Sequence, residues 1–236
     1  MLDINDLWDS RNERDWFIAL DRCRLTLADR KDHELIEFFH TVDLEYVRGL
    51  GVQEWYDFLV KYCHWQFAGN RLQQKLRDLD KNSFEQLFSV KSSLVAIDQR
   101  DLADARKCLS LVRSARIRGL DYSCASGLLA LLFKEWFGTA DSCILESLWT
   151  IESLPEKRKM QEILAWLNTR NDWRDSDAAL VVNIMRRKAA QPQHRFRHEQ
   201  VDSERRLHDT LDAQQTDWTR ICALVRQGFI DCKEKV

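Results

Sequence analysis

Asp141 is the side chain whose type and position in this sequence best fit a catalytic role. It follows the short segment 138–140 and precedes a stretch with helical apolar spacing, so it is expected at a helix start. A carboxylate there has an ordinary explanation, because Asp is a favoured helix N-cap. A carboxylate that projects into a cleft can instead stabilise a developing positive charge or activate water. The residues before Asp141 are needed to choose between the helix cap and the catalytic carboxylate.

Residues 107–134 are predicted to form a hairpin of two helices. One helix ends in the turn 117–121, and the next begins near residue 122 with a run of small residues that lets two helices approach closely. A tight turn into a helix leaves backbone N–H groups without partners, and such groups bind phosphate without reading base sequence. The residues expected to contact a DNA backbone are Arg116, Arg118, Gly119, Leu120, Tyr122 and Ser123.

The hairpin and Asp141 together resemble the helix-hairpin-helix DNA glycosylase superfamily, which includes endonuclease III and the oxoguanine glycosylases. The family hairpin reads roughly Leu/Ile-x-Gly-Val-Gly-x-Lys-x-Ala, and residues 117–125 take its place. Asp141 lies eighteen positions after Ser123, which matches the family distance between the hairpin lysine and the catalytic aspartate. The resemblance is specific over about 115–150 and suggestive over 58–114. It implies an all-α, two-lobed helical fold with Asp141 as the catalytic residue.

Two departures from the family pattern limit the implied chemistry. Asp121 replaces the second hairpin glycine and puts a carboxylate where phosphate should approach. Ser123 takes the place of the lysine that forms a Schiff base in bifunctional members, and serine cannot do this. The resemblance therefore implies a monofunctional hydrolase. The family's optional iron–sulfur cluster needs four closely spaced cysteines near the C-terminus, where only Cys222 and Cys232 lie, so we expect no cofactor and no metal.

The implied reaction also requires the target base to leave the duplex, so a side chain must fill the vacated stack. Residues 64–72 lie where the family places a helix and loop that probe the base stack. The candidates for the wedge or the base pocket are Trp65, Gln66, Phe67, Asn70 and Trp136. Aromatic residues at helical spacing also build ordinary cores, and this interpretation fits Trp65 and Phe67 at least as well.

Apolar residues recur at helical spacing through most of the chain, and its 7 Gly and 2 Pro are too few for the many turns of an all-β fold. We expect one helical glycosylase-like domain over residues 1–192. Beyond Pro192 the chain first becomes polar and basic, and apolar residues then recur at heptad-like spacing from Leu207 to Val225. Residues 193–236 are therefore predicted to form a basic linker and a C-terminal amphipathic helix, packed on its own domain in a monomer.

Charge and cysteine usage narrow the class of protein further. A net charge of −2 argues against a strongly basic nucleic-acid binder, so any DNA contact needs a local basic face. The seven cysteines are scattered and form no CxxC pair, which predicts reduced thiols. The first residues are acidic and polar, unlike a secretory signal, so we expect a cytoplasmic protein. No apolar run approaches the roughly 20 residues of a membrane span, so no membrane partner is expected.

The sequence thus predicts a DNA glycosylase that hydrolyses the N-glycosidic bond of a flipped-out modified or damaged base in double-stranded DNA. Its divergence and monofunctional character favour a modified base in foreign DNA, such as phage DNA, and hence antiviral defence. Two alternatives stay open. One is a non-catalytic helical DNA-binding protein that retains the hairpin, which Asp121 favours slightly. The other is a protein-interaction protein that uses the heptad-like seam at 207–225.

Overall fold

The computed structural model describes residues 4–12, 14–16, 33–67, 69–134, 136–169 and 172–191, and within these ranges the chain is all-α with no strand. The helices are α1 (Ile4–Asp9), α3 (His33–Thr41), α4 (Leu44–Gly49), α5 (Val52–Gln66), α6 (Gly69–Leu79), α7 (Phe84–Val95), the short 3-10 helix η1 (Asp101–Ala103), α8 (Ala105–Arg113), α9 (Tyr122–Leu132), α10 (Ser142–Thr150), α11 (Lys157–Asn168) and α12 (Asp175–Ala189). None of these helices is long and apolar enough to cross a membrane. The linker and helix predicted over 193–236, with the seam at 207–225, lie outside the described residues.

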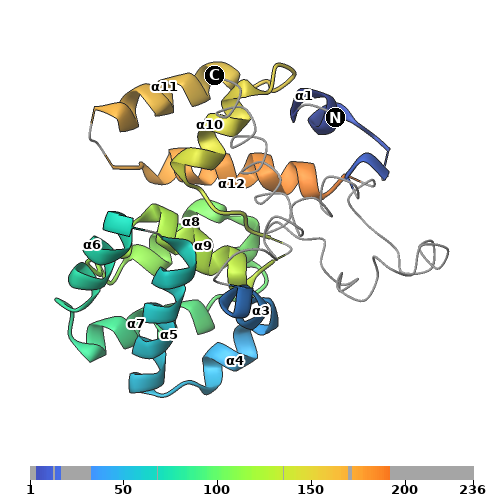
Figure 1. Ribbon diagram of the computed structural model, residues 1–236. Coiled ribbons are helices and arrows are strands. Elements are labelled where there is room, and N and C mark those ends of the chain that lie inside the picture. Colours follow the sequence, from blue (N-terminus) through green and yellow to red (C-terminus); the bar gives the residue numbers. More distant parts are fainter. Residues whose placement is uncertain are drawn as a thin grey trace.

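The helices form two groups (Figure 1). Helices α3 to α9 make up one group, and α1 lies with α10, α11 and α12 in the other. Helix α12 packs on α8 and α9 and so joins the groups. Hydrogen bonds tie α1 to the turn after α10: Glu152 N donates to Asn5 Oδ1 at 2.8 Å, and Ser153 Oγ donates to Asp9 Oδ1 at 2.6 Å. The middle of the chain therefore builds one group, and its two flanks build the other.

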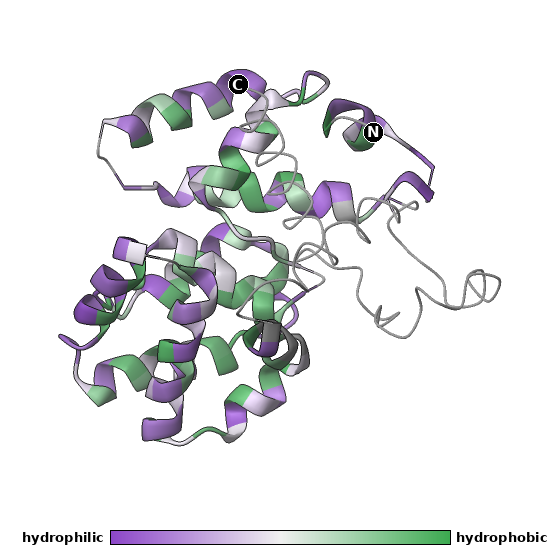
Figure 2. Cartoon of the chain, viewed as in Figure 1, coloured by the Kyte–Doolittle hydropathy of each residue, from purple (hydrophilic) through white to green (hydrophobic). Residues whose placement is uncertain are grey.

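Helix α9 lies in the interior of the molecule. Ten of its eleven residues are buried, which is the pattern of a helix enclosed by neighbours on every side. Its apolar half, residues 128–132, is among the hydrophobic segments of the larger group, whereas α6 carries mostly hydrophilic residues (Figure 2). Trp55 of α5 is fully buried nearby in the same core, and its Nε1 donates to Leu87 O of α7 at 2.7 Å. The core thus fixes the position of the second hairpin helix.

Local capping signals set several helix boundaries. Ser83 forms a capping box with Gln86, three residues later: Ser83 Oγ accepts from Gln86 N at 3.2 Å, and Gln86 Oε1 accepts from Ser83 N at 2.9 Å. Pro155 precedes Glu156, the N-cap of α11, and so lies just outside that helix. The Asp104 side chain caps α8 directly after η1, so these two elements are separate.

Candidate functional site

The two helices predicted to form the hairpin are present as α8 and α9, which pack on each other and are joined by residues 114–121. Gly119 makes the turn with a φ of 84°, in the left-handed region. A Cβ at this position would lie 3.1 Å from Lys75 O and 3.2 Å from Leu79 N, both in the backbone of α6. Glycine is therefore required here for its backbone freedom and for the space that it leaves.

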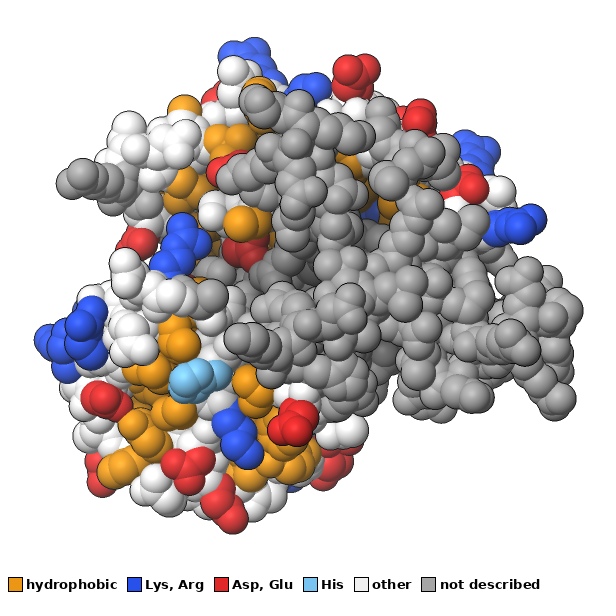
Figure 3. Space-filling view, in the orientation of Figure 1, with side chains coloured by type: hydrophobic (Ala, Val, Ile, Leu, Met, Phe, Trp, Pro, Cys, Tyr) orange, Lys and Arg blue, Asp and Glu red, His pale blue; other side chains and the backbone are white. Residues whose placement is uncertain are grey.

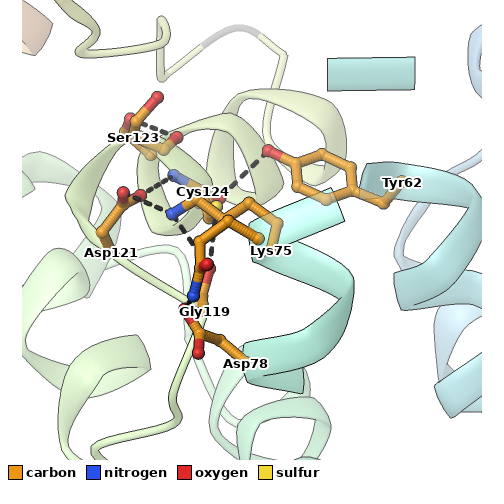
Figure 4. Close-up of polar contacts among 9 residues, drawn as sticks. Tyr62, Lys75, Asp78, Gly119, Asp121, Ser123 and Cys124 are labelled. Atoms are coloured by element: carbon orange, nitrogen blue, oxygen red, sulfur yellow. Dashed lines mark hydrogen bonds and ion pairs between the residues drawn. The ribbon is translucent and has the colours of Figure 1, made fainter. Parts of the chain in front are cut away.

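Helix α6 holds the hairpin turn through side-chain hydrogen bonds (Figure 4). Lys75 Nζ donates to Gly119 O at 3.2 Å and forms an ion pair with Asp121 Oδ2 at 2.5 Å. Asn82, just after α6, pairs with the backbone of Arg118: its Nδ2 donates to Arg118 O at 3.0 Å, and its Oδ1 accepts from Arg118 N at 2.9 Å. Both halves of the turn are thereby fastened to one neighbouring helix.

Asp121 has two structural roles at the place where a phosphate was expected to approach. Its Oδ1 accepts from Cys124 N at 3.0 Å, which caps α9, and its Oδ2 pairs with Lys75. Burial alone would raise the pKa of Asp121, but the charge of Lys75 and the hydrogen bonds from Lys75 and Cys124 outweigh burial and lower the pKa. The ionised carboxylate is therefore matched by a lysine charge, so Asp121 adds no unbalanced negative charge to the hairpin.

Lys75 does not replace the Schiff-base lysine that is missing at Ser123. Burial acts to lower the pKa of Lys75, but the nearby Cys124 sulfur and the Asp121 carboxylate outweigh burial and raise the pKa above its ordinary value. An amine must lose its proton to act as a nucleophile. The lysine that lies closest to the hairpin turn in these contacts is thus held in its unreactive, charged form.

Replacing Lys75 by Met should lower the free energy of unfolding by about 1 kcal/mol at neutral pH, because it leaves the Asp121 carboxylate without its cation. The Asp121 side chain is 40% exposed, so water screens the loss below that of a fully buried pair. A carboxylate with a lowered folded pKa stabilises the protein above its unfolded pKa, and this contribution disappears as the pH falls through the folded pKa. Urea unfolding of the wild type and of Lys75→Met should therefore show a difference in the free energy of unfolding that becomes smaller as the pH falls into the acid range.

The control for this substitution is Lys159→Met, which removes an exposed pair with Glu162 on α11 and should change stability little. A stability difference between the wild type and Lys75→Met that stays constant from neutral to acid pH would contradict the assigned role of the Lys75–Asp121 pair.

Asp141 is the N-cap of α10: its Oδ1 accepts from Ile144 N at 2.8 Å, and the residue is half-buried. The loop before it is anchored to α9, because Ala140 N donates to Ser126 Oγ at 2.8 Å and that hydroxyl donates to Ser123 O at 3.1 Å. Ser126 and Ala140 are fully buried. Asp141 is thus held one residue from a contact with the hairpin helix, where the chain passes from one group of helices to the other (Figure 1).

A side-chain contact joins α5, the helix that leads to the wedge candidates, to α9. Tyr62 Oη donates to Cys124 O at 3.0 Å (Figure 4). The approach depends on Gly127, because a Cβ there would overlap Tyr62 Oη and would lie 3.8 Å from Gln66 Nε2. Gly127 therefore leaves room on α9 for the end of the Tyr62 side chain, and the Gln66 side chain lies near the same position.

The remaining wedge and pocket candidates differ in their surroundings. Trp65 stacks on Phe39 with 4.9 Å between ring centroids, a packing contact with the core. Phe67 is half-buried at the end of α5, and the ammonium of the hairpin-bound lysine lies 5.2 Å from its ring centroid. Asn70 is exposed at the start of α6. Trp136 is half-buried in the turn after α9, with an arginine of α12 at 5.7 Å from its ring centroid. Gln66, Phe67 and Asn70 thus lie at or beside the α5–α6 turn, whereas Trp136 lies in the turn after α9.

Some of the residues predicted to bind the DNA backbone are buried or half-buried, and others are exposed. Leu120 is buried, and its N–H donates to Ile117 O at 3.3 Å, so this group serves the turn itself. Tyr122 is buried beneath the guanidinium of Arg113, which lies 3.7 Å from its ring centroid. Ser123 is half-buried at the start of α9. The two predicted arginines, 116 and 118, are exposed in the segment that joins α8 to α9.

Three positioning side chains were missed by sequence reasoning: Lys75, Asn82 and Ser126. Lys75 lies 46 positions before its partner Asp121, and Asn82 lies 36 positions before Arg118, so sequence spacing gives no signal for either pair. Ser126 belongs to the small-residue run that predicted close packing, and its hydroxyl was the available signal for a further role.

Asp141 lines neither of two surface hollows in the described part of the chain. They are lined by residues of α1, the turn 152–155 and the end of α12, including Trp8 and Lys188. In the same ranges, no group of three His, Cys, Asp or Glu side chains lies close enough together to hold a metal ion. No protein-family model, curated protein or solved structure matches this chain. The case for a function therefore depends on the geometry of the hairpin and of Asp141.

Proposed function

We propose that this protein is a monofunctional DNA glycosylase and that Asp141 is its catalytic carboxylate. The observation that carries the proposal is the placement of Asp141: it caps α10 one residue after a buried backbone anchor on the hairpin helix, in the segment that leads from one group of helices to the other (Figure 1). The division of the chain into a middle group and a flanking group fits the two-lobed fold that the resemblance to helix-hairpin-helix glycosylases implies.

The proposed reaction breaks the bond between C1′ of deoxyribose and the base nitrogen. The electron pair of that bond leaves with the base, which takes up a proton, and the sugar gains oxocarbenium character. The Asp141 carboxylate stabilises this positive charge, while a water oxygen bonds to C1′ and gives its proton to Asp141 and then to solvent. The products are a free base and an abasic site in an unbroken strand, because neither Ser123 nor the protonated Lys75 supplies an amine nucleophile.

The hairpin supplies the proposed grip on double-stranded DNA. The first N–H groups of a helix have no intrahelical acceptor, and Asp121 takes only that of Cys124, which leaves the N–H groups of Tyr122 and Ser123 for a phosphate. Arg116 and Arg118 are exposed on the same turn and add positive charge. Contacts of this kind hold the backbone without selecting a base sequence.

The segment from the end of α5 to the start of α6 is proposed to fill the stack when the target base leaves it. Gln66 and Asn70 have the polar side chains for this, and Gln66 already lies against α9. We assign the substrate as a modified base, with hypermodified bases of phage DNA as the favoured class. The departures at Asp121 and Ser123 from the family hairpin support this assignment.

The test is to incubate the full chain with duplex DNAs that carry oxidised, alkylated, mispaired or hypermodified bases and to identify released free base by mass spectrometry. We expect the wild type to release one class of base and to leave strands that break only on later alkaline treatment. Strand cleavage without alkali would contradict monofunctional hydrolysis. Release of no base from any of these DNAs would overturn the glycosylase assignment.

One observation favours a second candidate, a helical DNA-binding protein without catalytic activity. The carboxylate of Asp141 caps α10, and this local role alone is sufficient reason for an aspartate at the position. Under this alternative the wild type binds duplex DNA through the hairpin, and no base is released from modified substrates. The same incubation, with DNA binding measured alongside, separates the two candidates.

A further inference from the structure

One side of α6 faces the hairpin. Lys75 and Asp78 point toward Gly119 and Asp121 in Figure 4. A Cβ at Gly119 would lie 3.4 Å from Asp78 Cβ and 3.2 Å from Leu79 N, so the turn rests directly on this part of α6. These contacts fix which side of α6 is turned toward the hairpin.

Helical geometry then places the two arginines of α6 on different sides. Arg71 precedes Lys75 by four residues, so it lies about 40° from Lys75 around the helix axis and roughly 6 Å away along it. Arg77 follows Lys75 by two residues, so it points about 200° away. Both arginines are exposed. Arg71 therefore belongs to the side of α6 that continues the hairpin, and Arg77 belongs to the opposite side.

The arginines on the hairpin side form no ion pair within the described part of the chain. Asp121 and Asp78, the carboxylates closest to this surface in the observed contacts, pair with Lys75 at 2.5 Å and with Lys81 at 2.7 Å. Among the residues that the structure describes, no carboxylate pairs with the exposed arginines of the surface, which are Arg71, Arg116 and Arg118. Basic side chains are visible over α6 in Figure 3. A local basic face thus exists in a chain whose net charge is −2.

The spread of this surface fits the spacing of phosphates along a strand. Arg71 lies near the start of α6, and Arg118 is pinned to Asn82 just beyond its end. Eleven residues of helix span on the order of 16 Å, whereas one DNA strand carries a phosphate about every 3.4 Å along the duplex axis. The surface is therefore long enough to follow several consecutive phosphates, which a single small anion would not require.

We propose that Arg71 binds the phosphate backbone of DNA together with Arg116 and Arg118, so that the DNA-binding surface continues from the hairpin along α6 toward the α5–α6 turn. The proposal rests on the proposed function, because it takes DNA as the partner of the hairpin. It assigns a role to a helix for which the hairpin motif provides none.

The test compares Arg71→Gln with Arg77→Gln in the full chain. The affinity for a labelled, unmodified duplex is measured over a range of salt concentrations. Each phosphate contact contributes about 0.9 to the slope of log affinity against log salt, so Arg71→Gln should make the slope shallower by about that amount. Arg77→Gln should keep the wild-type slope, because it removes an equally exposed charge from the far side of the same helix. Thermal unfolding of both variants checks that α6 stays folded.

The outcomes distinguish this inference from the function on which it rests. Equal effects of Arg71→Gln and Arg77→Gln would overturn the inference, and so would a slope that responds to Arg116→Gln and Arg118→Gln but not to Arg71→Gln. That second result would leave the hairpin grip intact. An Arg71-dependent slope without any base release would support the inference and reject the glycosylase assignment.

The partner class is tested with the same proteins. Arg71-dependent binding to vesicles that contain phosphatidylserine, without binding to the duplex, would reject nucleic acid as the partner. A wild type that does not bind the duplex at all would overturn both the inference and the proposed function.

Discussion

Replacing Asp141 by Asn is expected to abolish base release while the protein stays folded. Asn is as good a helix N-cap as Asp, and its side-chain oxygen can accept from Ile144 N in the same way. The substitution removes the negative charge that would stabilise the cationic sugar and accept a proton from water. Loss of one preorganised electrostatic group of this kind lowers a rate by roughly 10²–10³-fold. Single-turnover release of free base is the measurement.

Two further variants separate charge from capping. Asp141→Ala should lose activity to the same extent as Asp141→Asn but should also lose about 1 kcal/mol of stability, because it removes the cap. Asp104→Asn changes an aspartate that caps α8 by the same kind of hydrogen bond, to Lys107 N at 3.0 Å, and should keep full activity. If Asp141→Asn releases base at the wild-type rate, Asp141 is a cap and has no catalytic role.

The predictions from sequence that the structure confirms depend on neighbours within a few residues. The helix start at Asp141 and the turn at Gly119 both follow from local chemistry: a side-chain oxygen that caps a first turn, and a residue without Cβ. The all-α class follows in the same way from repeated apolar spacing. Such signals survive in one sequence because their physical causes lie within one or two turns of helix.

Asp121 shows why contacts between residues far apart in the sequence could not be predicted. As a sequence feature it is an unfavourable carboxylate in a phosphate-binding turn. In the fold it caps α9 and pairs with Lys75, a residue 46 positions earlier. Only the packing of α6 against the turn brings the two charges together, and no periodicity or motif in the chain encodes that contact. Whether the Asp121 carboxylate adds net negative charge to the turn therefore depends on Lys75, a tertiary neighbour.

Trp65 and Phe67 illustrate the same limit for the proposed wedge. Aromatic side chains at the end of a helix suit both a core and a base stack, so their spacing cannot decide between the two. Trp65 stacks on Phe39 of the core, while Phe67 lies beside Lys75 at the α5–α6 turn. The division between them is set by which neighbouring helix each ring meets.

Replacing Gly127 by Ala is expected to lower the free energy of unfolding by about 2–4 kcal/mol, the cost of overpacking together with a lost buried hydrogen bond. In most helix interiors this change would stabilise, because Ala has the higher helix propensity. Here the new Cβ would overlap the hydroxyl of Tyr62, which is 1% exposed and donates to Cys124 O. The tyrosine ring must therefore move away from α9, and the contact that holds α5 against the hairpin helix is lost.

Tyr62→Phe should rescue Gly127→Ala, because it removes the overlapping atom and leaves the ring carbon of position 62 at 3.3 Å from the new Cβ. Tyr62→Phe alone should cost about 1 kcal/mol for the lost hydrogen bond. Adding Gly127→Ala to it should then be close to neutral, so the coupling energy in a double-mutant cycle should reach about 2 kcal/mol. Urea unfolding of the four proteins measures this coupling. Gly49→Ala, where a Cβ meets nothing within 4 Å, is the control for glycine replacement itself. Equal losses from Gly127→Ala in both backgrounds would show that α5 and α9 do not meet through Tyr62 and Gly127.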